Sequence, residues 1–151
     1  MLEQETSYTY EILIHDDAST DNTQEIIKEY AELYPNKVFP VLQKENKYSH
    51  GISVNYTYNF MRARGKYIAL CEGDDYWVNK YKLQKQVEYM QQHLECMISV
   101  HNADVVDIDG HYIQDFLSEK RNYFNKYKHG TKEYSANEMI ILGFVPTASM
   151  E

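Results

Sequence analysis

The sequence has only two cysteines, Cys71 and Cys96, and no long apolar run. Two cysteines are too few for a disulfide framework or a cysteine metal site, and their apolar surroundings predict buried free thiols. A run of about 18 apolar residues would be needed for a membrane-spanning helix. The opening residues MLEQETSYTYE also lack the basic and apolar regions of a secretory signal. We therefore expect a cytoplasmic location, which includes the inner face of the membrane.

Positive charge is also in short supply. The chain has 15 Lys and Arg against 23 Asp and Glu, which gives a formal net charge of -8. Non-specific binding to nucleic acid requires clustered positive charge, so this balance argues against it. An acidic site still suits a phosphate-bearing small ligand, because a divalent cation can bridge carboxylates to phosphates. No repeat, low-complexity tract or Pro/Gly-rich linker divides the 151 residues, and we interpret residues 1–151 as a single domain.

What the chain does contain is an alternation of apolar strands and amphipathic helices. Gly65 has the character of a helix C-terminal cap, Pro40 favours an edge strand, and Asp109-Gly110 is typical of a turn. The alternation predicts an α/β fold, a mostly parallel sheet flanked by helices. The expected strands cover residues 10–15, 37–42, 66–71, 97–101 and 105–108, and the expected helices cover residues 23–34, 51–64, 80–94 and 135–142.

Two acidic clusters each follow an expected strand. Residues 16–21 read DDASTD, and residues 72–77 read EGDDYW. The carboxyl ends of neighbouring parallel strands face one crevice, so we expect these acids to converge. Three carboxylates within four residues repel one another unless a cation or proton intervenes, and oxygen ligands of this kind suit Mg²⁺ or Mn²⁺. The alternative is that both clusters are solvated loops that cap helices.

Both clusters resemble one known family. The run EILIHDDASTDNT (residues 11–23) resembles the first acidic loop of family 2 glycosyltransferases, which have a GT-A fold. The run ARGKYIALCEGDDYW (residues 63–77) resembles the Asp-X-Asp (DXD) segment of the same family. The helix sequence KLQKQVEYM (residues 82–90) is similar to a bacterial branch that builds surface polysaccharides. The resemblance covers residues 3–110 well and the remainder weakly.

The resemblance implies a role for each acidic residue. One or both of Asp16 and Asp17 would contact the uracil or ribose of a nucleotide-sugar donor. Asp74 would hold the Mn²⁺ or Mg²⁺ that bridges the two phosphates. Glu72, which stands where the family more often has Asp, would be the second metal ligand. Glu72 or Asp75 would also contact ribose, metal or donor sugar.

The function implied is transfer of a sugar from a nucleotide-diphosphate sugar to a glycan or lipid-linked acceptor, with metal assistance and inversion. A UDP-sugar is the donor that the resemblance favours, and polysaccharide assembly is the setting. The family also has a strand before the segment that MLEQETS resembles, and a general base after the segment that PTASM resembles. We therefore expect a GT-A domain incomplete at the N-terminal strand and in the C-terminal part, with the base beyond Glu151.

Other interpretations apply to these clusters and to further polar residues. A non-catalytic remnant that binds nucleotide or a partner protein fits the incomplete ends, and an open sheet edge leaves self-association open. A phosphoacceptor receiver domain would explain Asp16 and Asp17 but gives the EGDDYW segment no role. His15 is expected to be structural, and a hairpin turn explains Asp104, Asp107 and Asp109 better than catalysis does.

Overall fold

The computed structural model describes residues 1–116, which fall into two compact units. The first unit contains Met1 and Thr6–Ile68, and the second contains Leu2–Glu5 and the chain from Ala69 onward. The helix predicted over residues 135–142 lies outside the described residues. The interpretation of the whole chain as a single domain stays a prediction.

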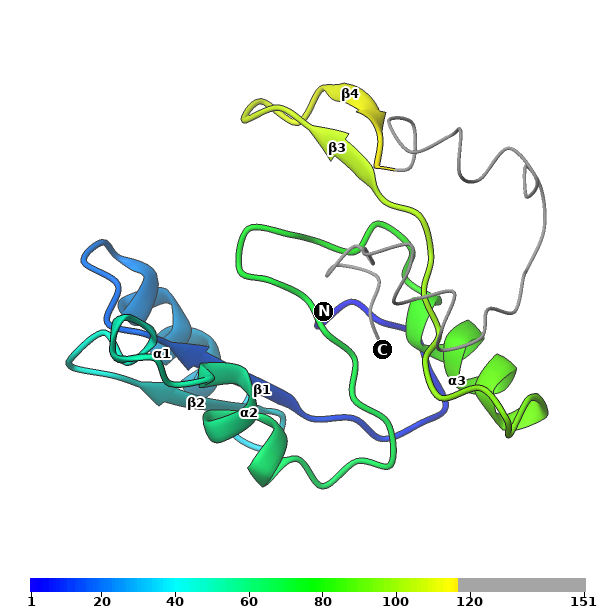
Figure 1. The fold of residues 1–151 in the computed structure, drawn as a ribbon, viewed down its shortest axis with the longest axis horizontal. Helices are drawn as coiled ribbons and strands as arrows, with labels where there is room; N and C mark the ends of the chain where they lie inside the picture. Colours follow the sequence, from blue (N-terminus) through cyan, green and yellow to red (C-terminus); the bar gives the residue numbers. More distant parts are fainter. Residues whose placement is uncertain (117–151) are drawn as a thin grey trace. The chain divides into compact units, whose positions relative to one another are not determined.

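The first unit is built on a strand–helix–strand crossover. Strands β1 (Ile12–Asp16) and β2 (Val38–Leu42) pair in parallel, and helix α1 (Thr23–Leu33) connects them (Figure 1). Parallel neighbours require such a crossover, because a tight turn cannot return the chain in the same direction. Helix α1 and strand β2 lie within their predicted ranges, and β1 overlaps the predicted residues 10–15 and ends one residue later, at Asp16, so these three predictions are confirmed. The parallel pair and its helices agree with the predicted α/β class.

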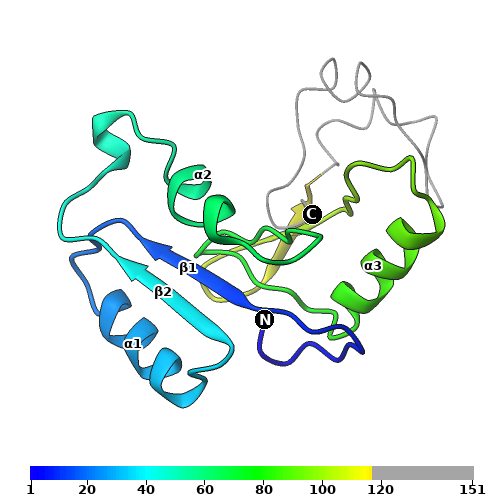
Figure 2. The same ribbon diagram turned by 90° about the horizontal axis from the view of Figure 1, so that it is seen from below.

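The core of the first unit lies where the two strands begin. Ile12 and Val38 face each other in the register and are 8% and 3% exposed. Helix α1 packs mainly on β2, and helix α2 (Val54–Tyr58) lies on the opposite side of the strand pair (Figure 2). The register also aligns the last residues of both strands, Asp16 and Leu42. Polar residues that follow the strands therefore gather at one end of the sheet.

The helix predicted over residues 51–64 is wrong in its extent. The chain forms only α2 and then a separate 3-10 turn, η2 (Phe60–Arg62). The segment VNYTYNF is rich in β-branched and aromatic residues and Asn, which have low helix propensity. The turn at η2 also directs the Arg62 side chain onto backbone carbonyls of both strands. Ala63 follows in an extended conformation, so Gly65 is not the helix cap that the sequence suggested.

Up to residue 116, the second unit contains one α-helix and one hairpin. Helix α3 (Lys82–Gln92) confirms the prediction over residues 80–94. Strands β3 (Asp104–Val106) and β4 (Tyr112–Asp115) pair in antiparallel, and Gly110 takes a left-handed φ of 83° at the turn. The predicted turn is confirmed. Strand β4 was not predicted, because the short segment YIQD lacks a clear apolar alternation.

Two predicted strands are wrong. Residues 66–71 and 97–101 have the apolar composition of strands, but neither segment pairs with another strand within residues 1–116. A strand exists only through ladder hydrogen bonds to a neighbour, and local sequence does not supply that neighbour. The described parallel sheet therefore has two strands. No helix in the part of the chain described is long and apolar enough to cross a bilayer.

Candidate functional site

Asp16 ends β1 as a nearly buried carboxylate that is 5% exposed. Its Oδ1 accepts a hydrogen bond from the Ser19 backbone N–H at 3.1 Å and another from Gln24 Nε2 at 2.6 Å. Burial raises the pKa of Asp16, but these hydrogen bonds outweigh it and hold the pKa below its ordinary value. Gln24 Nε2 also donates to the carbonyl of Gln43, just past β2. Asp16 is thus ionised and joined to both strand ends.

Asp17 is engaged in a different way. Its Oδ1 accepts a hydrogen bond from the backbone N–H of Lys47, and its Oδ2 accepts one from the backbone N–H of Tyr48, both at 2.8 Å. Burial works to raise the pKa of Asp17, and these two backbone hydrogen bonds bring it below its ordinary value. Asp17 therefore ties the end of β1 to the loop that follows β2.

The residue after this pair has an unusual backbone. Ala18 has a φ of 67°, the left-handed region that L-residues other than glycine rarely adopt. This sharp turn lets the Ser19 amide reach back to Asp16 while Asp17 points toward the Lys47 amide. Strain of this kind persists where surrounding contacts enforce it, and it is commonly found at functional sites.

His15 packs beside Asp16 and Asp17. Its side chain is 3% exposed, and its ring stacks on Tyr58 with a centroid distance of 4.6 Å. Nε2 lies 3.9 Å from Asp17 Oδ1 and makes no hydrogen bond within the described residues. Burial lowers the pKa of His15, so the ring is mainly neutral near neutral pH. The packing agrees with the structural role expected for this histidine.

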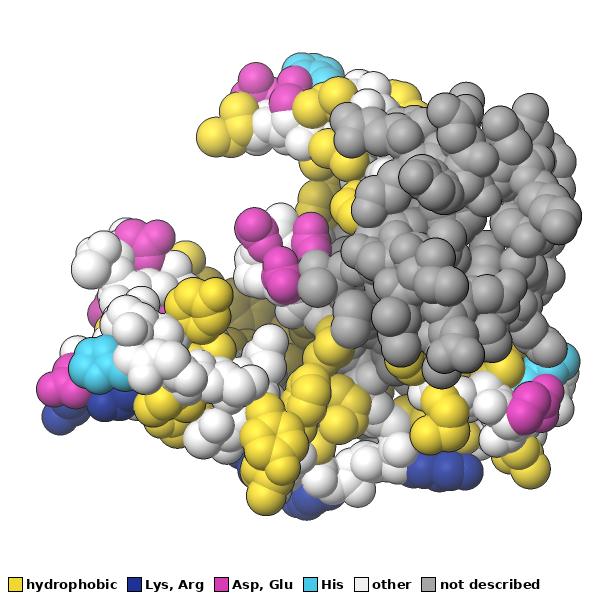
Figure 3. All heavy atoms as spheres, in the orientation of Figure 1, with side chains coloured by type: hydrophobic (Ala, Val, Ile, Leu, Met, Phe, Trp, Pro, Cys, Tyr) yellow, Lys and Arg dark blue, Asp and Glu magenta, His cyan; other side chains and the backbone are white. Residues whose placement is uncertain are grey.

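The second acidic cluster belongs to the second unit. Glu72, Asp74 and Asp75 each place one carboxylate oxygen within 4.8 Å of the other two, and all three residues are exposed. Acidic side chains stand at the surface in this region (Figure 3). Partial burial and the charge of Asp74 raise the pKa of Asp75. Three hard oxygen donors at this spacing fit a shared Mg²⁺ or Mn²⁺, which would relieve their repulsion.

The cysteines differ from the prediction in one respect. Cys71 and Cys96 are free thiols, as expected, but they are half-buried. Burial still raises the pKa of Cys71, whose Sγ lies 3.6 Å from the carbonyl oxygen of Asp75. Cys71 was expected inside a strand, and without that strand it is less well covered. It lies beside the acidic loop as a packing residue and not as a reactive thiolate.

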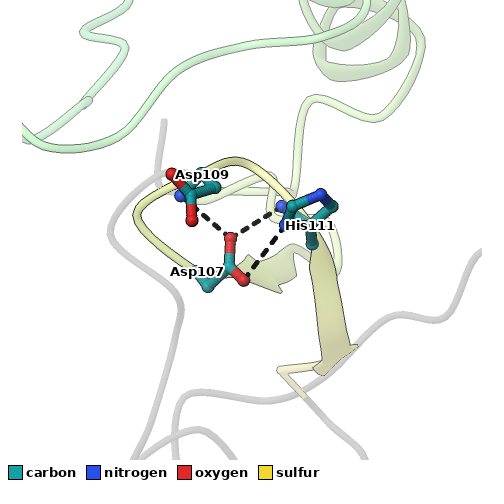
Figure 4. A group of neighbouring side chains, drawn as sticks. All are labelled: Asp107, Asp109 and His111. Atoms are coloured by element: carbon teal, nitrogen blue, oxygen red, sulfur yellow. Dashed lines mark hydrogen bonds and ion pairs between the residues drawn. The ribbon is translucent and has the colours of Figure 1, made fainter.

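A third acidic group lies at the tip of the β3–β4 hairpin and combines Asp107, Asp109 and His111 (Figure 4). The carboxylate of Asp107 accepts hydrogen bonds from the backbone N–H of His111 at 2.8 Å and of Asp109 at 2.9 Å. Its other oxygen pairs with His111 Nδ1 at 3.3 Å. Hydrogen bonds from His111 and Asp109 lower the pKa of Asp107. This is the arrangement of a side chain that caps a turn, and it confirms the hairpin interpretation.

The structure thus anchors Asp16 and Asp17 to different partners at the end of β1, and it brings Glu72, Asp74 and Asp75 together. The predicted convergence of the two groups stays a prediction. Sequence reasoning missed the partners of the first pair. Gln24 was visible only as a polar residue on a helix. The amides of residues 47 and 48 carry no sequence signal, because every residue except proline has such an N–H.

Comparison with known proteins gives one family match. The model of glycosyl transferase family 2 matches residues 1–144. No solved structure matches the chain.

Individual relatives cover the same region. An uncharacterised Mycobacterium tuberculosis protein is 43% identical over 121 residues, which is 79% of this chain and 34% of that protein. An uncharacterised glycosyltransferase of Methanocaldococcus jannaschii is 30% identical over 82% of this chain and 41% of its own length. The Escherichia coli UDP-Glc:α-D-GlcNAc-diphosphoundecaprenol β-1,3-glucosyltransferase WfaP is 34% identical over 60% of this chain and 34% of its own length. This chain spans about a third of the length of the mycobacterial relative.

Proposed function

The chain belongs to glycosyl transferase family 2, and on this premise we propose that it supplies the donor-binding part of a glycosyltransferase. Membership implies the GT-A, Rossmann-like fold, and β1–α1–β2 is a parallel crossover of the kind that this fold repeats. The proposed reaction moves a sugar from a nucleotide-diphosphate sugar to a glycan or lipid-linked acceptor. The proposed outcome at the sugar carbon is inversion.

One observation carries the proposal, namely the oxygen cluster of Glu72, Asp74 and Asp75 in a chain of this family. We propose that Asp74 and Glu72 hold Mn²⁺ or Mg²⁺ and that Asp75 contacts the metal or the donor. A bound divalent cation supplies Lewis-acid stabilisation of a leaving diphosphate. The carboxylates themselves fix where the diphosphate lies, and positioning of this kind supplies much of the rate in transfer reactions.

The nucleotide end of the donor is assigned to the first acidic pair. We propose that one or both of Asp16 and Asp17 define the site for uracil or ribose, at the end of the parallel strands where α/β folds bind such ligands. An ionised carboxylate at Asp16 can accept a hydrogen bond from a base N–H or a ribose hydroxyl.

The E. coli relative supports the choice of donor and acceptor. Its name gives it a UDP-glucose donor and an α-D-GlcNAc-diphosphoundecaprenol acceptor. By analogy we propose a UDP-sugar donor, a lipid-linked or glycan acceptor, and a part in bacterial surface polysaccharide assembly at the cytoplasmic face of the membrane. We assign no general base among the described residues.

The test is calorimetric titration of UDP with and without Mn²⁺. Wild-type chain, Asp74→Ala and Asp109→Ala would be compared. Asp109 is the matched control, because it is an exposed acid in the hairpin group and its removal changes the net charge equally. We expect Mn²⁺-dependent binding that weakens by about tenfold or more in Asp74→Ala and stays unchanged in Asp109→Ala, since a lost metal ligand removes the charge that bridges to phosphate.

Two results would contradict the proposal. UDP binding of the same affinity with and without Mn²⁺ would mean that the oxygen cluster does not hold a bridging cation. Equal losses in the two variants would mean that only overall charge matters. Hydrolysis or transfer from a UDP-sugar, measured by UDP release, would then separate an active enzyme from a non-catalytic nucleotide-binding domain.

A further inference from the structure

We propose that Lys82 is a positioning residue for residues 72–75, the acidic turn, and that it holds this turn in the shape that a divalent cation needs. Its buried side chain lies beside the residues that enter and leave the turn, Cys71 and Trp77. The inference rests on the proposed function, since it concerns the support of the metal site proposed above. Lys82 is not itself a metal ligand, because an ammonium has no lone pair to offer.

The hydrogen bonds that close the acidic turn are weak ones. The backbone N–H of Asp75 donates to the carbonyl of Glu72 at 3.2 Å, which is the long end of the range for such a bond. The Cys71 thiol, a weak donor, reaches the carbonyl of Asp75 at 3.6 Å. The three carboxylates of the turn also repel one another. The turn therefore depends on support from a neighbouring part of the fold.

That support comes from the first residue of helix α3. Lys82 is 5% exposed, and its Nζ lies 4.3 Å from the centroid of the Trp77 ring. A cation over the face of an indole is attracted by the ring, and the attraction is stronger where water is excluded. Trp77 follows the turn by two residues and is itself half-buried. This contact fixes the chain where it leaves the turn.

The same ammonium also acts on the residue that enters the turn. Burial raises the pKa of the Cys71 thiol, and the charge of Lys82 opposes that rise. Burial lowers the pKa of Lys82 to about 8, and Cys71 opposes that change in turn. Interactions between charges weaken with distance, so this mutual effect places the two side chains close together. Lys82 therefore lies near both ends of the acidic turn.

The start of α3 is itself held in place. The Gln4 side chain accepts a hydrogen bond from the backbone N–H of Leu83 at 3.0 Å and donates one to the carbonyl of Asn79 at 2.8 Å. The backbone N–H of Glu5 donates to the carbonyl of Lys80 at 2.7 Å. The Gln4 contact satisfies one of the N–H groups that lack a partner inside the helix. Lys82 thus extends from a fixed helix end, which suits a side chain that positions a turn.

The first experiment measures Mn²⁺ binding without nucleotide, by electron paramagnetic resonance of the free ion. The 151-residue wild type, Lys82→Met, Trp77→Leu and Lys85→Met are compared. Lys85 is the matched control, because it is an exposed lysine of the same helix. We expect Lys82→Met and Trp77→Leu each to weaken Mn²⁺ binding by about tenfold, as the loss of a residue that orients metal ligands does. Lys85→Met should leave the affinity unchanged.

The sign of the Lys82 effect separates positioning from charge. Removal of a positive charge near an acidic site should by itself strengthen the binding of a divalent cation. A positioning role predicts the opposite, weaker binding. Tighter or unchanged Mn²⁺ binding in folded Lys82→Met would therefore overturn the proposal.

Two further variants test whether the ammonium and the indole act together. The double variant Lys82→Met/Trp77→Leu should bind Mn²⁺ no more weakly than the weaker single variant, because both substitutions remove one contact. A double loss equal to the product of the two single losses would overturn that contact as the cause. Trp77→Phe keeps an aromatic face and serves the test if Trp77→Leu does not fold. It should retain most of the affinity, and a tenfold loss would count against the contact.

The second experiment needs no metal. Trp77 is the only tryptophan of the chain, so its fluorescence reports on the end of the acidic turn. We expect acrylamide to quench this fluorescence more strongly in Lys82→Met than in wild type or Lys85→Met, because the ring is released. Equal quenching in the three proteins would overturn the positioning role. If the wild type binds no Mn²⁺, the proposed function fails, while the quenching still decides whether Lys82 holds the turn.

Discussion

The imidazole of His15 lies flat against the phenol ring of Tyr58, with 4.6 Å between centroids and an interplanar angle of 2°. This contact joins the end of β1 to α2, and it places a buried titratable ring directly beside the Asp17 carboxylate. The packing of His15 on Tyr58 therefore helps to set the position of the first acidic pair.

The buried ring predicts that stability falls in mild acid. Burial lowers the pKa of His15 below 6.5, and Arg62 acts in the same direction, while Asp17 and Asp16 oppose them. The unfolded chain therefore binds a proton at His15 more readily than the folded chain does. The stability that the neutral ring contributes is fully present above about pH 6.5 and declines as the pH falls below that value. Chemical denaturation at about pH 7 and about pH 5.5 would measure the decline.

The matched variant for this prediction is His15→Phe, which keeps an aromatic ring against Tyr58 and cannot titrate. We expect its stability to change less between the two pH values than that of wild type. An identical pH dependence in the two proteins would show that other groups cause the loss.

Replacement of Arg62 or Arg64 by lysine should lower the stability by different amounts. Arg62 is half-buried and donates hydrogen bonds to the carbonyls of Ile14 and Phe39, on neighbouring strands. Lysine cannot reproduce this planar set of donors, so Arg62→Lys should lower the free energy of unfolding by about 2 kcal/mol. Arg64 is exposed and pairs with Glu11 at the surface, where solvent screens the ion pair, so Arg64→Lys should lower the free energy of unfolding much less than Arg62→Lys does. Denaturant midpoints measure both, and equal losses would contradict the assignment.

Ala18 predicts a stabilising substitution. Its φ of 67° costs an L-residue roughly 1–2 kcal/mol, and glycine avoids that cost while losing about 0.5–1 kcal/mol of chain entropy on folding. Ala18→Gly should therefore be neutral or stabilise by up to about 1 kcal/mol. Ala18→Val should destabilise, because a β-branched residue tolerates positive φ least. Thermal unfolding of the pair checks the sign, and a stabilising valine would refute the strained turn.

The buried Lys82 side chain should make the stability of the chain depend on pH in the alkaline range. The residue is 5% exposed, its ammonium lies 4.3 Å from the centroid of the Trp77 ring, and burial lowers its pKa to about 8. The unfolded chain holds this proton up to its ordinary pKa of 10.5, so the stability contributed by this group rises between pH 8 and 10.5. The rise is at most about 3 kcal/mol.

Lys82→Met should remove this rise, whereas Lys85→Met, a substitution at an exposed position of the same helix, should keep it. Urea denaturation at about pH 7.5 and about pH 9.5 compares the three proteins. A rise that persists in Lys82→Met would assign it to other groups.

The sequence predicted the strand–helix–strand start of the fold well, because residues 12–42 carry their own signals. The apolar runs of the two strands and the amphipathic pattern of the helix between them are local features, and the structure confirms all three elements. The expected strands over 66–71 and 97–101 failed for the opposite reason. A strand needs a partner, and the apolar character of a segment does not say whether a partner lies beside it.

The candidate site likewise has features that are local in the sequence and features that depend on the tertiary structure. The sequence determined which side chains carry the chemistry, since clustered carboxylates after strands are a matter of residue type and position, and it determined the family. Only the tertiary structure decided what each carboxylate does in the fold. Asp16 binds Gln24, Asp17 binds two amides about 30 positions away, and Asp107 closes its own turn. These partners are set by the path of the chain in space, and backbone N–H groups, which every residue except proline offers alike, carry no signal in a sequence.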